Sequence, residues 1–122
     1  MTIAFWCVFV ASFLPYVAFS FVKGLNPRCP RAGVPALDDQ SARAYGAHLN
    51  AFETYAPFAA AVIIAHVARG PSILVDILAI LYVLARVAHL VAYLNDRQPV
   101  RSAMFTVGSL ITVAIFISAA FH

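Results

Sequence analysis

The sequence predicts an all-α membrane protein, built as a bundle of four transmembrane helices in a single domain over residues 1–122. The first observation is composition: 63% of the residues are hydrophobic and only 11% are charged. Soluble domains carry roughly 25% charged residues, so this chain lacks the polar surface that water requires. The second is the grouping of the apolar residues into segments long enough to cross a bilayer as helices. The third is the concentration of Lys and Arg near one end of those helices.

The first span is expected over residues 2–22, which contain no charged side chain. As a helix this segment would be roughly 30 Å long, which matches the hydrocarbon core of a bilayer. A cleaved signal peptide is the alternative interpretation, but it requires a basic start, and the first cation is Lys23. Because membrane helices tolerate proline, we expect Pro15 to kink this helix rather than end it.

The rest of the chain alternates between polar breaks and apolar helices. Asp39 or Ser41 is expected to cap the second helix, and Ser72 to cap the third. A short helical turn is expected near residues 36–42. A long loop is expected over residues 23–41, followed by the second span over residues 42–68. A turn at residues 69–71 leads to the third span over residues 72–95. A break at residues 96–100 leads to the fourth span over residues 101–121.

The distribution of cations predicts the orientation in the membrane. With four spans, both termini lie on the same side as the turn at Arg69. The other side carries the remaining cations near the helix ends, namely Lys23, Arg28, Arg31, Arg43, Arg97 and Arg101. Cytoplasmic loops are enriched in Lys and Arg, so loops 23–41 and 96–100 are expected in the cytoplasm and the termini outside. The compact chain without a targeting extension favours a bacterial inner membrane.

Several other classes of site are not expected. The net charge is +3 and there is no basic run, which argues against nucleic acid as a partner. Cys7 and Cys29 are too few and too far apart for a metal site or a disulfide scaffold. Of the other ionisable residues in the apolar segments, Asp76 is expected to suit the helix dipole, and His66 to be a packing or interfacial residue.

Two helices carry polar side chains that a simple anchor does not need. Asn50, Glu53 and Pro57 share one face of the second helix. The corresponding face of the third helix carries Tyr82, Arg86, His89 and Tyr93. At about 1.5 Å per residue, Glu53 and Arg86 both lie roughly 15 Å from the cytoplasmic ends of their helices. We therefore expect them to form an ion pair, since either charge alone in hydrocarbon costs several kcal/mol.

This polar face has two interpretations. A buried ion pair can fix helix packing without forming a binding site. However, Asn50, His89, Tyr93 and Arg101 would extend a polar track from the pair to the cytoplasmic surface. A track of hydrogen-bond donors that is open at one face suits a polar, anionic ligand.

Two stretches around these residues resemble the MAPEG family, the membrane-associated proteins in eicosanoid and glutathione metabolism. The first, residues 43–57, contains an asparagine, a glutamate three residues later and a proline four residues after that. The second, residues 85–93, contains Arg86, His89 and Tyr93 and is followed by Pro99-Val100-Arg101-Ser102. These motifs are most similar to those of the family's microsomal prostaglandin E synthases and glutathione transferases.

The resemblance implies a homotrimer in membrane lipid, with glutathione bound between adjacent subunits near the cytoplasmic face. Arg101 would match the arginine that stabilises the glutathione thiolate, and Ser102 the neighbouring serine that assists. A guanidinium favours the anion and so lowers the pKa of the thiol. The thiolate would then attack a lipophilic electrophile or reduce a hydroperoxide that enters from the bilayer. The residues implied to bind glutathione are Asn50, Glu53, Arg86, His89 and Tyr93.

The sequence also departs from the family pattern. Gly46 and Leu49 stand where catalytic relatives carry arginine, and Lys23, Arg43 and Arg97 are candidates to replace them. The family includes a non-catalytic lipid-binding member, so a lipid-binding or partner-binding membrane protein is the alternative function. A small multidrug transporter is a third class, but such transporters rely on an acidic residue in the first span, which residues 2–22 lack.

Overall fold

The computed structural model describes residues 1–121, so His122 lies outside the described part. Every regular element in that part is a helix. In chain order the elements are α1 (Ile3–Ala11), α2 (Leu14–Phe19), the 3₁₀ helix η1 (Pro30–Ala36), α3 (Asp39–Arg69), α4 (Ile73–Leu94) and α5 (Gln98–Ser118). The all-α fold class is therefore confirmed.

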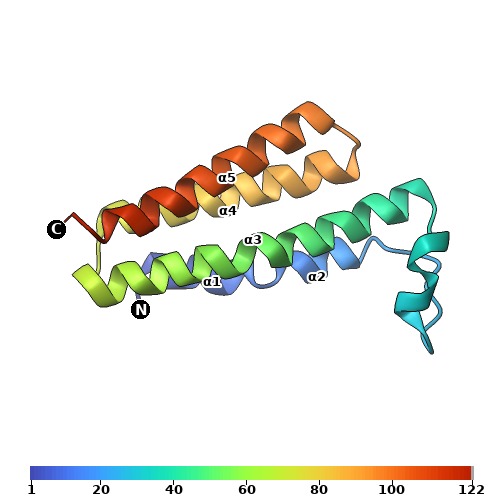
Figure 1. Ribbon diagram of the computed structural model, residues 1–122, viewed down its shortest axis with the longest axis horizontal. Coiled ribbons are helices and arrows are strands. Elements are labelled where there is room, and N and C mark those ends of the chain that lie inside the picture. The colour runs from blue at the N-terminus through green and yellow to red at the C-terminus, as the bar shows by residue number, and fades with distance from the viewer. Residues whose placement is uncertain (122) are drawn as a thin grey trace.

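Three helices are long and apolar enough to cross a membrane. They are α3 with 31 residues, α4 with 22 and α5 with 21. The N-terminal apolar segment is shorter, because α1 and α2 together cover only Ile3–Phe19. The chain is thus an integral membrane protein with three long apolar helices and a shorter N-terminal one, which lies along α3 (Figure 1).

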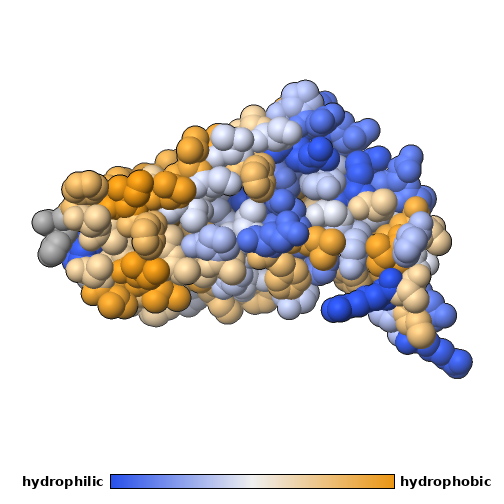
Figure 2. Space-filling model, in the orientation of Figure 1, coloured by the Kyte–Doolittle hydropathy of each residue, from blue (hydrophilic) through white to orange (hydrophobic). Residues whose placement is uncertain are grey.

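The helices run back and forth, so that both termini and the α3–α4 turn lie at one end of the bundle (Figure 1). The segment with η1 and the α4–α5 turn lie at the other end, here called the loop end. Figure 2 shows hydrophobic side chains over the terminal end and hydrophilic ones over the loop end. On the visible face the hydrophilic colours also extend from the loop end toward the middle of the bundle.

The N-terminal segment is interrupted just before Pro15 and forms two short helices, where one kinked helix was expected. α1 ends at Ala11 and α2 begins at Leu14, but Ser12 and Phe13 between them keep right-handed helical backbone angles. Pro15 has no N–H to donate to the preceding turn, which interrupts the hydrogen-bond ladder without reversing the chain. The His48 ring on α3 makes a 2.7 Å hydrogen bond to the Pro15 carbonyl oxygen, so the start of α2 is attached to α3.

The start of α3 differs from the prediction in two respects. The cap is Asp38, whose Oδ1 accepts a 2.7 Å hydrogen bond from the Ser41 N–H; the prediction of Asp39 or Ser41 was wrong. The Ser41 hydroxyl instead accepts from the Lys23 N–H at 3.0 Å and ties the loop to the helix. The short helical turn expected near residues 36–42 lies earlier, as η1 (Pro30–Ala36), because α3 itself already begins at Asp39.

The α3–α4 turn forms where it was expected. Gly70 has a φ of 81°, a conformation that glycine adopts without a steric cost. Arg69 Nη1 donates a 3.2 Å hydrogen bond to the Ser118 carbonyl and so joins the end of α3 to the end of α5. Ser72 occupies the N-cap position of α4, although its side chain makes no capping hydrogen bond.

Two ionisable residues at the terminal end hold α1 in place. Asp76 Oδ1 accepts a 2.7 Å hydrogen bond from the Ala4 N–H, one of the free donors at the start of α1. His66 makes 2.8 Å hydrogen bonds to the Thr2 hydroxyl and to the Val62 carbonyl. The packing role expected for His66 is confirmed, and Asp76 complements the start of α1 as well as its own helix.

The centre of the bundle is built around Tyr82 of α4. Its ring stacks on the Phe58 ring of α3, with 3.7 Å between the ring centres and 8° between the ring planes. Its hydroxyl donates a 3.0 Å hydrogen bond to the Thr54 carbonyl. On the other side, a Cβ added to Gly108 of α5 would lie 3.5 Å from Arg86 Cδ. The absence of a side chain at Gly108 therefore brings α5 close to α4 beside the polar residues of the membrane helices.

Candidate functional site

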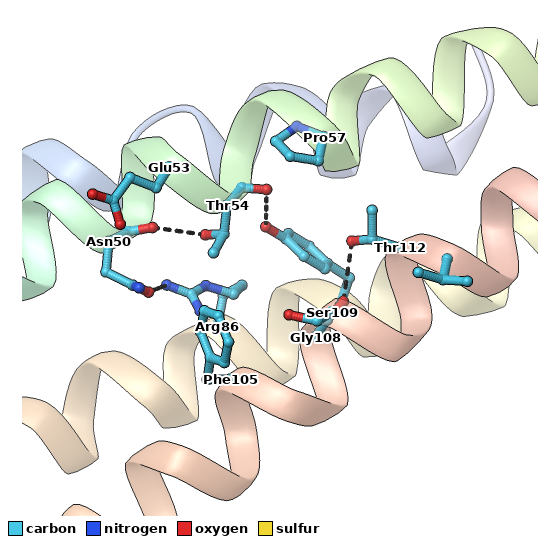
Figure 3. A pocket seen from close by; sticks show the side chains of 11 residues that line it. Asn50, Glu53, Thr54, Pro57, Arg86, Phe105, Gly108, Ser109 and Thr112 are labelled. Atoms are coloured by element: carbon cyan, nitrogen blue, oxygen red, sulfur yellow. Dashed lines mark hydrogen bonds between the residues drawn. The ribbon is translucent and has the colours of Figure 1, made fainter.

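Arg86 is the central polar residue between α3 and α4. Its side chain is only 3% exposed. Nη2 donates a 2.7 Å hydrogen bond to Asn50 Oδ1 (Figure 3). This contact links the two polar helix faces that the sequence predicted, one from each helix.

The predicted Glu53–Arg86 ion pair is wrong. Glu53 is exposed, and within residues 1–121 the guanidinium bonds to Asn50 rather than to a carboxylate. Asn50 lies about one turn closer to the loop end and provides the acceptor, while Glu53 is exposed on the outside of the single chain.

The other terminal nitrogen of Arg86 is unsatisfied. Nη1 is buried and has no hydrogen-bond partner among the described residues. A buried donor left without an acceptor costs about 1–3 kcal/mol, and more when it is charged. The chain therefore holds a buried cation with one terminal nitrogen that lacks an acceptor among the described residues.

A cavity of about 380 Å³ lies beside Arg86, between α3, α4 and α5 (Figure 3). Its polar wall combines Asn50 and Arg86 with the hydroxyl residues Thr54, Ser109 and Thr112. The remaining wall is largely apolar. We call this space the inner cavity; its other lining residues are Glu53, Pro57, Tyr82, Phe105, Gly108 and Val113.

A second cavity, of about 310 Å³, shares Asn50 and Phe105 with the inner cavity. We call it the outer cavity; it is also lined by His89, Tyr93, Arg101, Ser102 and Thr106. Next to it, a hollow of about 370 Å³ is lined by Tyr93 and Arg101 together with Asp39, Ala42, Arg43 and Asp96. The shared residues place these spaces side by side, along the path from mid-helix to the loop end that the polar track predicted.

Arg101 is held by an aromatic ring rather than by a carboxylate. Its guanidinium carbon lies 4.5 Å from the centre of the Tyr93 ring, and a cation over an aromatic face is attracted by the ring quadrupole. The Tyr93 ring in turn packs edge to face with the His89 ring, and the two ring centres lie 5.6 Å apart. Arg101 also lines the outer cavity, so the guanidinium borders that space as well as the ring.

The structure brings all of the predicted site residues to these two cavities. Glu53 and Arg86 line the inner one, Asn50 lines both, and the others line the outer one. The prediction named Arg101 and Ser102 of α5 but missed the α5 residues that line the inner cavity. Phe105, Ser109 and Thr112 follow Ser102 at helical spacing, so the polar residues on this face of the last span were the signal that could have found them.

The two positions that depart from the family pattern lie in different places. A Cβ added to Gly46 would overlap the Tyr93 hydroxyl oxygen and lie 3.0 Å from Tyr93 Cζ, so Tyr93 fills that space. Leu49 is 44% exposed and lines a separate hollow with Tyr16 and His48. An arginine at Leu49 would therefore start on the side of α3 that faces α2, away from the inner and outer cavities.

Comparison with known families agrees with the motifs. The model of the MAPEG family matches residues 1–121, essentially the whole chain. No curated protein matches the chain. Residues 1–121 contain no cluster of His, Cys, Asp or Glu that could hold a metal ion.

Proposed function

The chain belongs to the MAPEG family, and from this premise we propose that it is a membrane-bound enzyme that uses glutathione to modify lipophilic molecules. The reactions are conjugation of an electrophile or reduction of a hydroperoxide. The observation that carries the proposal is the buried Arg86 with its unsatisfied Nη1 beside a cavity. A buried guanidinium with a free N–H group is suited to bind a carboxylate.

The charges around the cavities match those of glutathione. At neutral pH the tripeptide carries two carboxylates and one ammonium group. Arg86 and Arg101 line adjacent cavities, and Arg43 lines the neighbouring hollow. Glu53 lines the inner cavity, and Asp39 and Asp96 line the hollow with Arg43. We assign the peptide carboxylates to the arginines and the ammonium group to Glu53, with Asn50, His89 and Tyr93 as further contacts.

Arg101 is assigned to the thiol. A guanidinium near the sulfur favours the thiolate, and the Ser102 hydroxyl can donate to it. In conjugation the thiolate forms a sulfur–carbon bond and the leaving group departs with its electron pair. In peroxide reduction the sulfur attacks the peroxide, the O–O bond breaks and an alcohol leaves. A second glutathione then converts the resulting sulfenic acid to the disulfide and water.

The lipophilic substrate is proposed to enter from the bilayer. Phe105 and Val113 line the inner cavity and are 41% and 52% exposed on the outside of the bundle. Side chains that line a cavity and also face lipid provide an apolar path to it. We further propose a homotrimer, in a bacterial inner membrane with the loop end in the cytoplasm, which would bring a neighbouring subunit against these open cavities.

Turnover with and without glutathione tests the proposal. Purified protein is given a chloronitroaromatic electrophile or a lipid hydroperoxide, and wild type is compared with Arg101→Ala. Arg28→Ala, which removes an exposed loop arginine, is the matched control. We expect thiol-dependent turnover in wild type and control, and its loss in Arg101→Ala. Normal turnover in Arg101→Ala would remove the assigned role, and no thiol-dependent reaction in wild type would refute the enzyme.

The second candidate is a non-catalytic lipid-binding protein of the same family. It is favoured by Gly46, which stands where catalytic relatives carry arginine, and by the apolar wall of Pro57, Phe105 and Val113. Lipid that remains bound through purification, in a protein without any thiol-dependent reaction, would support this candidate instead.

A further inference from the structure

We propose that Gly46 is a positioning residue that sets the place of Arg101 through Tyr93. This inference rests on the proposed function, because it concerns how the thiol-peptide site is shaped. The three residues come from three helices: Gly46 from α3, Tyr93 from the last turn of α4 and Arg101 from the first turn of α5. No two of them are neighbours in sequence, so their arrangement is a property of the fold.

The first contact is between Gly46 and Tyr93. The Tyr93 hydroxyl occupies the space that a Cβ at position 46 would need, and Cζ of the ring would lie 3.0 Å from that Cβ. Real Cβ atoms essentially never lie under 3.0 Å from another atom, and the Tyr93 hydroxyl oxygen would lie closer than that. Any side chain at position 46 must therefore displace the Tyr93 ring from its place against α3.

The second contact is between Tyr93 and Arg101. The guanidinium lies over the ring at 4.5 Å from its centre, and His89 borders the same ring edge to face at 5.6 Å. Tyr93 and Arg101 both line the outer cavity and the hollow that contains Arg43. The ring is thus the common wall of two spaces, and its position decides where the guanidinium lies relative to both.

These contacts predict that a substitution at Gly46 disturbs the glutathione site more than it disturbs the fold. The atom that meets the new Cβ is the far end of the Tyr93 side chain rather than backbone. The ring can move while the α3 and α4 backbones stay in place. Gly46→Ala should therefore leave a folded protein in which Arg101 has lost its aromatic platform and thiol-peptide binding is weakened.

A double-mutant cycle tests this route. Glutathione binding is measured by calorimetry for wild type, Gly46→Ala, Tyr93→Phe and the double variant. Tyr93→Phe removes the overlapping hydroxyl but keeps the ring under Arg101. We expect Gly46→Ala to raise Kd about ten-fold when Tyr93 is present, because a cation–π contact is lost. In the Tyr93→Phe background the same substitution should raise Kd by no more than about two-fold.

Gly33→Ala in η1 is the matched control, because a Cβ there would lie 3.4 Å from the Leu25 side chain, an ordinary contact distance. Thermal unfolding of all variants shows whether they are folded. Equal Kd values for wild type and Gly46→Ala would overturn this inference alone. An equal loss in both Tyr93 backgrounds would also overturn it, since the effect would not pass through the hydroxyl. Absence of binding in wild type would overturn the proposed function together with this inference.

Discussion

The unsatisfied guanidinium of Arg86 leads to a prediction in which binding and stability respond differently to one substitution. Arg86→Met keeps a long side chain of similar shape but removes the charge and all of its donors. In the ligand-free protein two effects oppose each other. The hydrogen bond from Nη2 to Asn50 is lost, and the buried Nη1 without a partner is removed.

The magnitudes of these two effects are similar. A hydrogen bond to a charged group contributes about 1.5–3 kcal/mol, and a buried unsatisfied donor costs about 1–3 kcal/mol. Asn50 is half-buried and lines both cavities, so its side chain borders open space. The free energy of unfolding should therefore change by no more than about 1 kcal/mol. Glutathione binding has no such compensation, and loss of one charge-assisted hydrogen bond should raise Kd by roughly 10- to 150-fold.

The assay combines calorimetric titration of glutathione with thermal unfolding in the same detergent. Arg28→Met, which makes the same substitution at an exposed loop position, is the control and should bind as wild type does. An unchanged Kd in Arg86→Met would refute the role assigned to the free N–H group. A large drop in its melting temperature would instead show that Arg86 is retained for packing.

Three further substitutions have distinct expected outcomes. Arg101→Lys keeps the charge but loses the guanidinium that lies over the Tyr93 ring. The kcat with glutathione should therefore fall at least several-fold, while the melting temperature stays the same. An unchanged kcat would contradict the role assigned to the Arg101–Tyr93 contact. Phe58→Ala removes a fully buried ring that stacks on Tyr82 and should lower the free energy of unfolding by about 3–5 kcal/mol in a denaturation assay. Asp76→Ala removes the acceptor of the Ala4 N–H, so hydrogen exchange at the start of α1 should accelerate; equal exchange in the variant would show that this contact does not hold α1.

The helices and the faces they present could be predicted because hydrophobic length and helical spacing act locally. The span at residues 72–95 appears as α4 (Ile73–Leu94), and Gly70 and Pro71 end the preceding helix where expected. The polar residues of α3 and α4 meet for the same reason. Charged and amide groups in an apolar helix avoid lipid, so their faces turn toward each other.

The partner of Arg86 could not be predicted from depth along the helix. Glu53 and Arg86 lie at matching depths, but side-chain direction and the position of α5 decide which acceptor the guanidinium reaches, and it reaches Asn50. The contact of Tyr93 with Gly46 was missed because it depends on the spacing between two helices. A glycine in a sequence does not show which neighbour fills its space.

The most direct test of the account is the thiolate absorbance of glutathione titrated into wild-type protein at neutral pH, with the heat of binding recorded in parallel. If the cavities bind glutathione and Arg101 favours its ionised sulfur, the absorbance rises to saturation at the same concentration as the heat signal. Saturating heat without an absorbance change would contradict the thiol activation assigned to Arg101. A folded protein that shows neither signal would contradict the glutathione site itself.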